Sequence, residues 1–229
     1  MRRALASFCA VLMASAVQAD VTAARLTQPT DRYDHGVLGD ALEWGGMRIA
    51  TSAGAVEVTL PPSRVFEDVE ARVVDLDGDG SAEVLVVEAD IALGASLAVY
   101  DGAGQVTATP YIGQTHRWLA PLGVGDMDDD GLPEIAYVDR PHLARELVIV
   151  QYRNRKLVEI ARLSGLTNHR IGERTISGGY RDCGQGGEMI LANADWSQLM
   201  AVRLQGGLSP RALGPYSKAA MARALACAP

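Results

Sequence analysis

Two short acidic loops carry the residues whose types and spacing are best suited to chemistry. Each has the pattern D-x-D-x-D-G, in which the first, third and fifth side chains turn toward one centre and the glycine supplies a backbone conformation that other residues resist. The predicted ligands are Asp75, Asp77, Asp79, the Ser81 carbonyl and Glu83 in the first loop, and Asp126, Asp128, Asp130, the Leu132 carbonyl and Glu134 in the second. Because Ca²⁺ takes about six to eight hard oxygen ligands, the pattern predicts a calcium site in each loop.

Other interpretations of these loops make different demands on the sequence. An EF-hand loop begins in the same way, but it needs a glutamate at the twelfth position and helices on both sides. The twelfth positions here are Val86 and Tyr137, and the runs 84–87 and 135–138 have the composition of strands. Mg²⁺ prefers a smaller, octahedral and partly hydrated site. An aspartate-rich turn that holds no ion is the open alternative.

The two loops belong to a repeat, because the residues around them also match. Each loop follows a short apolar stretch and precedes a β-branched run, and a further strand candidate comes next, at 96–100 or at 146–152. A copy without most of the carboxylates begins at Tyr180, and another candidate begins at His35. Anchors near 35, 75, 126 and 180 thus divide the chain into units of about fifty residues, in which the acidic loop joins the first strand to the second.

The pattern apolar-x-D-x-D-G-D-G-x-x-E, followed by an apolar strand, resembles the FG-GAP/VCBS repeat, which also builds the propeller of integrin α-subunits. The resemblance is strong at 73–87 and 124–138 and weak at 35–44 and 180–192. It implies four-stranded blades around an axis, with structural Ca²⁺ in the loop between the first two strands. We therefore predict an all-β fold over residues 20–229, a small β-propeller of about four to five four-stranded blades or an incomplete ring that pairs with a partner. The alanine-rich tail 217–226 is expected to form one short helix.

The first nineteen residues have the order of a secretory signal peptide. Arg2 and Arg3 precede a mostly apolar run from Ala4 to Val17, and a small-x-small cleavage site ends at Ala19. The run is short for a membrane span, which needs roughly 20 apolar residues. We expect cleavage after Ala19 and a periplasmic or secreted protein without a transmembrane segment; an uncleaved first helix is the alternative.

Charge and cysteine content narrow the class of partner and the compartment. The formal net charge is −7, and loss of the signal peptide leaves 19 basic residues against 28 acidic ones, a charge of −9. An acidic chain argues against nucleic acid as a partner, because phosphates are bound by basic surfaces. Cys183 and Cys227 follow the predicted cleavage site, and an oxidising compartment favours a disulfide between them. A buried thiol at Cys183 with a free one at Cys227 is the alternative.

A second regularity is a series of arginines, Arg64, Arg117 and Arg170, spaced 53 residues apart, with His116 and His169 directly before the last two. In a propeller this position leads into the innermost strand beside the central channel. Three guanidinium groups that met there would form an anion site. The alternative is that each arginine pairs with a carboxylate of a neighbouring blade.

Together these features favour a non-catalytic, calcium-binding module of the cell envelope that binds a protein or an anionic small molecule, or acts as a scaffold. A hydrolase or lyase that uses the propeller channel to act on an envelope polymer is one alternative, and a structural element of a larger assembly is another. A G-x-S-x-G motif is absent, and the four histidines lack zinc spacing. A disulfide at Cys183 would also remove the one candidate nucleophile that His169 could activate.

Overall fold

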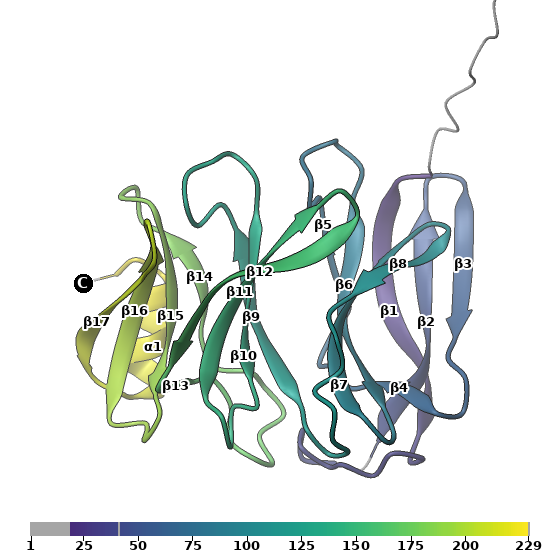
Figure 1. Cartoon of the computed structure of the whole chain (residues 1–229), viewed down its shortest axis with the longest axis horizontal. Helices are drawn as coiled ribbons and strands as arrows, with labels where there is room; N and C mark the ends of the chain where they lie inside the picture. Colours follow the sequence, from purple (N-terminus) through teal and green to yellow (C-terminus); the bar gives the residue numbers. More distant parts are fainter. Residues whose placement is uncertain (1–18, 41, 229) are drawn as a thin grey trace, which may run out of the picture.

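The structure is a computed structural model that describes residues 19–40 and 42–228. The predicted signal peptide, apart from Ala19, lies outside the described residues. Within them the chain forms seventeen strands and one short helix, so the all-β prediction is confirmed. Figure 1 shows the strands arranged as sheets that stand side by side. No helix among the described residues is long and apolar enough to cross a membrane.

The first sheet contains two groups of strands. The first group is β1 (Val21–Thr30), β2 (Glu43–Thr51) and β3 (Gly54–Thr59). The second is β4 (Arg64–Phe66), β5 (Arg72–Val74), β6 (Glu83–Asp90), β7 (Gly94–Asp101) and β8 (Gly104–Ala108). β4 and β5 follow one another along the same edge of β6. One residue pair, Trp44 with Phe66, joins the groups into an eight-stranded sheet.

The other two sheets repeat the plan of the second group. The second sheet is β9 (Leu119–Gly125), β10 (Glu134–Asp139), β11 (Glu146–Arg153) and β12 (Lys156–Ser164). The third is β13 (Leu166–Thr167), β14 (Gly179–Asp182), β15 (Gly187–Asn193), β16 (Gln198–Leu204) and β17 (Leu208–Pro215). All neighbouring strands are antiparallel, and β13 and β14 together occupy the first strand position.

The central strands of the second and third groups are buried on both faces because each of these groups packs between two others. Successive side chains of a strand point to opposite faces. In β6, Val84 and Val86 therefore join the core shared with the first group, whereas Leu85 and Val87 join the core shared with the second sheet. The last strand of a group is half exposed instead, and β12 alternates between exposed and intermediate residues. This explains why the sequence of a central strand is a continuous apolar run, whereas the sequence of an outer strand alternates between apolar and polar residues.

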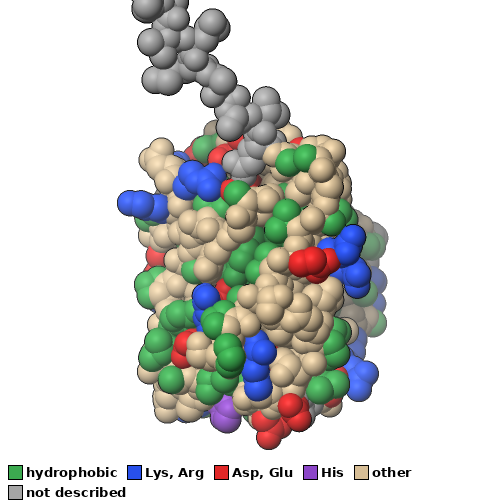
Figure 2. All heavy atoms as spheres, turned by 90° about the vertical axis from the view of Figure 1, so that its right-hand side faces the viewer, with side chains coloured by type: hydrophobic (Ala, Val, Ile, Leu, Met, Phe, Trp, Pro, Cys, Tyr) green, Lys and Arg blue, Asp and Glu red, His purple; other side chains and the backbone are tan. Residues whose placement is uncertain are grey.

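The groups form an open row. In Figure 1 the first group stands at one end and β17 at the other. The helix α1 (Lys218–Leu225) packs through Met221 and Ala224 against the third sheet, and it begins after Ser217, whose hydroxyl accepts a hydrogen bond from the Ala220 N–H group at 3.0 Å. The helix expected over 217–226 is therefore confirmed. Figure 2, which faces the first group, shows apolar, charged and uncharged side chains intermixed on that end of the row.

The strand count differs from a set of equal four-stranded blades. The second, third and fourth groups have four strand positions each, but the first group has three strands, and none of the three sheets closes on itself. The first two groups are fused because β3 ends at Thr59, opposite Gly46, and leaves Trp44 open to pair with β4. The sequence predicts the strands, but it does not predict where β3 ends or the pairing of β2 with β4 that follows.

The acidic loops lie together at one end of the strands, at the top of Figure 1. Residues 75–82 join β5 to β6, residues 126–133 join β9 to β10, and residues 183–186 join β14 to β15. A Cβ atom on Gly78 would lie 3.3 Å from the Leu132 side chain, and one on Gly186 would lie 3.6 Å from the Asp129 carboxylate. Consecutive loops are therefore direct neighbours.

The segment around His35 lies at the opposite end. Asp20, just before β1, accepts a hydrogen bond at 3.0 Å from the N–H group of Ala82, which ends the first acidic loop. β1 then runs away from that loop, so the connection 31–42 between β1 and β2 is at the far end of the strands (Figure 1). This segment thus differs in position from the anchors near 75, 126 and 180.

Candidate metal centres

The first acidic loop is organised by hydrogen bonds to its own carboxylates. Asp75 accepts from the N–H groups of Gly78 and Gly80 at 2.8 and 2.9 Å. Glu83, the first residue of β6, accepts from the N–H group of Leu76 at 3.0 Å. Gly80 has a φ angle of +87°, in the left-handed region that favours glycine. The D-x-D-x-D-G pattern therefore fixes this loop locally.

The second loop repeats this arrangement. Asp126 accepts from the N–H groups of Asp130 and Gly131 at 3.1 and 3.0 Å, and Glu134 accepts from the N–H group of Met127 at 2.8 Å. Gly131 has a φ angle of +88°, matching Gly80. The bond from the loop glycine to the first aspartate and the bond to the glutamate are therefore equivalent in the two loops.

Each loop brings three carboxylate groups to one point. Within each cluster one oxygen of every carboxylate lies within 4.8 Å of the others: Asp75, Asp77 and Glu83 in the first, Asp126, Asp128 and Glu134 in the second. The remaining predicted side-chain ligands bond within or beside their loops. Asp79 accepts from the Ser81 N–H group at 2.7 Å, and Asp130 accepts from the Leu132 N–H group at 2.9 Å and from Arg153 at 3.0 Å.

Burial and the crowding of negative charge raise the pKa of carboxylates in both clusters. Burial raises the pKa of Glu83 to about 7, and the nearby aspartates add to the rise. Burial and neighbouring aspartates also raise the pKa of Glu134 and of Asp77. A bound cation relieves this repulsion, and a set of oxygen donors alone fits Ca²⁺ better than metals that prefer nitrogen or sulfur.

In the third loop, arginine side chains of the protein supply the positive charge. Glu188 follows this loop as Glu83 and Glu134 follow theirs, but its carboxylate contacts three guanidinium groups at 2.5–3.0 Å: those of Arg181, Arg203 and Arg211. Burial tends to raise the pKa of Glu188, yet these hydrogen bonds outweigh it and lower the pKa to about 2. Arginines therefore take the place here that a cation would take in the other loops.

A disulfide ties this third loop to the end of the chain. Cys183 and Cys227 are bonded, with their Cα atoms 5.7 Å apart, and Cys227 follows α1 directly. The predicted pairing is confirmed. The bridge holds α1 against the third sheet, whose outer face the helix covers.

The evenly spaced arginines have separate partners. Arg64 donates to Glu88 at 2.7 Å, Arg117 donates to the carbonyl of the preceding histidine at 2.9 Å, and the guanidinium of Arg170 lies 4.3 Å above the ring of Trp196. Arg64 begins β4 and Arg117 lies just before β9, whereas Arg170 lies in the connection between β13 and β14. Their side chains follow local contacts, and these contacts do not gather the three guanidinium groups around one anion site.

His116 and His169 belong to a cluster that sequence spacing does not reveal. The four histidines form two contacting pairs: the rings of His35 and His116 stack with centroids 5.1 Å apart, and His142 Nε2 lies 3.0 Å from His169 Nδ1. The Trp118 ring is 4.9 Å from that of His169. Each histidine comes from a different connection at the end opposite the acidic loops, so no local sequence motif predicts the cluster.

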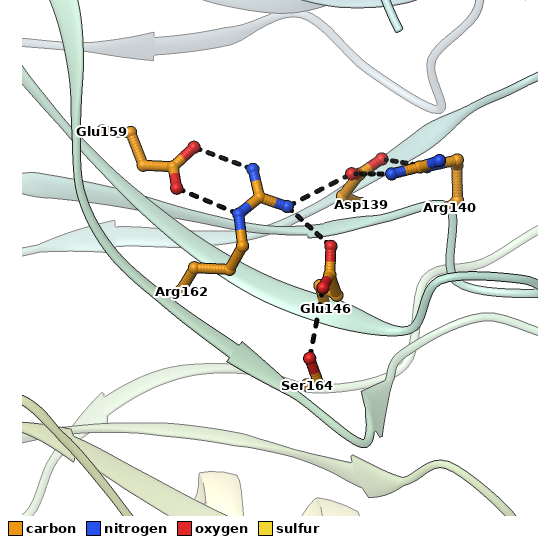
Figure 3. Close-up of polar contacts among 6 residues, drawn as sticks. All are labelled: Asp139, Arg140, Glu146, Glu159, Arg162 and Ser164. Atoms are coloured by element: carbon orange, nitrogen blue, oxygen red, sulfur yellow. Dashed lines mark hydrogen bonds and ion pairs between the residues drawn. The ribbon is translucent and has the colours of Figure 1, made fainter.

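A groove between the second and third groups has ion pairs on its wall. Arg162, on β12, contacts Asp139, Glu146 and Glu159 at 2.8–3.3 Å, and Arg140 pairs with Asp139 at 2.8 Å (Figure 3). These carboxylates are bound to guanidinium groups. The wall therefore presents paired charges.

Comparison with known proteins identifies one repeat directly. The FG-GAP-like repeat family matches residues 72–137, which run from β5 through both acidic loops into β10. The chain thus contains an FG-GAP-like repeat at these residues, and the resemblance inferred from the loop residues is confirmed. No curated protein matches the chain.

Proposed function

We propose that this protein is a non-catalytic, calcium-bound module of the propeller type that binds a protein partner in the periplasm or outside the cell. The observation that carries the proposal is the pair of equivalent carboxylate clusters in neighbouring loops. In this proposal the four strand groups are four blades of an open arc, and the first blade lacks its innermost strand.

The proposed role of calcium is structural. Asp75, Asp77 and Glu83 would hold one ion, and the equivalent residues of the second loop would hold another. A bound ion supplies positive charge that offsets the repulsion between these carboxylates. Because Glu83 and Glu134 begin β6 and β10, this charge would stabilise the first turn of two adjacent blades. In this proposal the residues of both clusters bind metal and take no part in catalysis.

Two observations support an exported binding protein. The disulfide between Cys183 and Cys227 suits an oxidising compartment, in keeping with the signal peptide predicted at 1–19. The separate partners of Arg64, Arg117 and Arg170 favour a protein partner over an anionic small molecule. Repeats of this kind present broad surfaces, which suit protein binding better than a deep pocket does.

Calorimetric titration of chelator-treated 20–229 with Ca²⁺ tests the proposal. We expect binding of two equivalents in the wild type and none in the double variant Asp77→Asn/Asp128→Asn. A wild-type protein that is folded but binds no Ca²⁺ would refute the metal assignment. Mg²⁺ at equal concentration is the control for charge screening, and it should give a much weaker signal.

A further inference from the structure

The outer face of the third sheet carries a group of arginines beyond the part that α1 covers. Ala201, on β16, packs in the core between this sheet and the helix. Because side chains two positions apart share one face of a strand, Arg203 lies on the same face. Arg181 and Arg211 join it there, since all three guanidinium groups contact the Glu188 carboxylate. The four strands from β14 to β17 thus contribute one charged side chain each to this cluster.

These side chains line an open pocket of about 310 Å³ that the end of the chain also borders. Cys227, held by its disulfide to Cys183, and Ala228 belong to the lining. Among the described residues of the lining, the charged side chains are three arginines and one glutamate, so the pocket has a surplus of two positive charges. The protein as a whole has a formal net charge of −7, which makes this a local positive site on an acidic molecule.

The Glu188 carboxylate does not need all three arginines. Arg181 alone binds its Oε2 through Nε and Nη2, at 3.1 and 2.5 Å, and donates its other Nη to the Ala224 carbonyl. Arg203 reaches Oε1 through Nε alone at 3.0 Å, and Arg211 reaches the same oxygen through Nη2 alone at 2.9 Å. Their other N–H groups donate to none of the described residues. The two guanidinium groups therefore converge and keep donors that can bind a further acceptor.

Two other carboxylates lie near the pocket. Asp182 follows Arg181 directly in β14, so its side chain points to the opposite face, and it accepts from the Gly184 N–H group at 2.7 Å. Asp129 lies beside Gly186 at the rim of the pocket and belongs to the second acidic loop, where the proposed calcium ion would offset its charge. The surplus of positive charge at Arg203 and Arg211 therefore remains in the calcium-bound protein.

We propose that this pocket binds a tetrahedral oxyanion with two negative charges, the group that a sulfate or phosphate ester carries, through Arg203 and Arg211. Guanidinium groups bind the oxygens of such anions with paired N–H donors, and a charge of two matches the surplus. Glu188 positions both arginines, and Arg181 holds Glu188 in place. This anion site uses other arginines than the evenly spaced series, and it is independent of the identity of the protein partner.

The test follows the arginine side-chain signals of isotope-labelled protein by NMR while sodium sulfate is added, in Ca²⁺ and at constant ionic strength. We expect the signals of Arg203 and Arg211 to shift and to saturate, whereas acetate, which has one charge, should shift them much less. Arg203→Gln and Arg211→Gln should each weaken the sulfate affinity by roughly tenfold or more. Glycerol phosphate is titrated in parallel. Binding equal to that of sulfate would support recognition of the anionic group alone, and tighter binding would support an ester of a larger molecule.

Arg48→Gln is the matched control, because Arg48 is an exposed arginine of the first sheet with one ion pair, to Glu57, and its loss should leave the sulfate affinity unchanged. The Arg211 side chain is 59% exposed, so its substitution should not impair folding, which circular dichroism verifies. The proposal is overturned if sulfate causes no saturating shift in the folded wild type, which would leave the arginines as structural partners of Glu188. It is also overturned if both glutamine variants bind sulfate as tightly as the wild type.

Discussion

Substitution of Asp77 by asparagine should change stability in opposite directions with and without calcium. Asp77 is an exposed member of the first cluster, and the change keeps its size while removing one charge. In chelator, the substitution relieves repulsion with Asp75 and Glu83, so the melting temperature should stay equal or rise slightly. In calcium, it removes a ligand and should lower the melting temperature.

The magnitude follows from linkage. A site filled at a hundred times its dissociation constant stabilises the folded state by about 2.7 kcal/mol. For a domain of this size, each kcal/mol corresponds to a shift of roughly 2–4 °C. One site therefore accounts for roughly 5–10 °C of the calcium-dependent rise in melting temperature, and Asp77→Asn should lose about that much, half of the total if the two loops bind equally.

The assay is a pair of thermal melts, in excess calcium and in chelator, followed by circular dichroism. Asp31→Asn is the matched control, because it makes the same charge change at an exposed position outside both loops. Two results would refute the reasoning. The variant could keep the full calcium-dependent shift, or it could lose the same stability in chelator as in calcium, which would show a role for Asp77 in the turn and not in metal binding.

Two further predictions concern the third loop. The pKa of Glu188 is held at about 2, below its ordinary 4.5, so its contribution to stability is present above pH 4.5 and is lost as the pH falls toward 2. The difference in unfolding free energy between the wild type and Glu188→Gln, measured in urea, should therefore shrink over that range. A constant difference would contradict the assignment. The Cys183–Cys227 bridge closes a loop with a sequence separation of 44. Cys227→Ala should therefore lower the unfolding free energy by roughly 4 kcal/mol, and dithiothreitol should destabilise the wild type but leave the variant unchanged.

The sequence by itself determined the elements whose geometry is local. The acidic loops could be predicted because their bonds are local: Asp75 bonds to residues three and five positions away, and Asp126 bonds to residues four and five positions away. The strands could be predicted because burial on two faces requires continuous apolar runs, as in β6. The disulfide followed from there being two cysteines after the predicted cleavage site.

Tertiary structure alone decided which distant residues meet. His35 lies in the connection between β1 and β2, and Glu67 follows β4. Packing of the first two strand groups brings their side chains together, so no spacing in the sequence marks the pair. The even spacing of Arg64 and its two counterparts follows the length of the repeat, although Arg170 lies between β13 and β14 and not at the start of a strand. It did not indicate their contacts, because a long flexible side chain is directed by whichever carboxylate, carbonyl or aromatic ring lies within its reach.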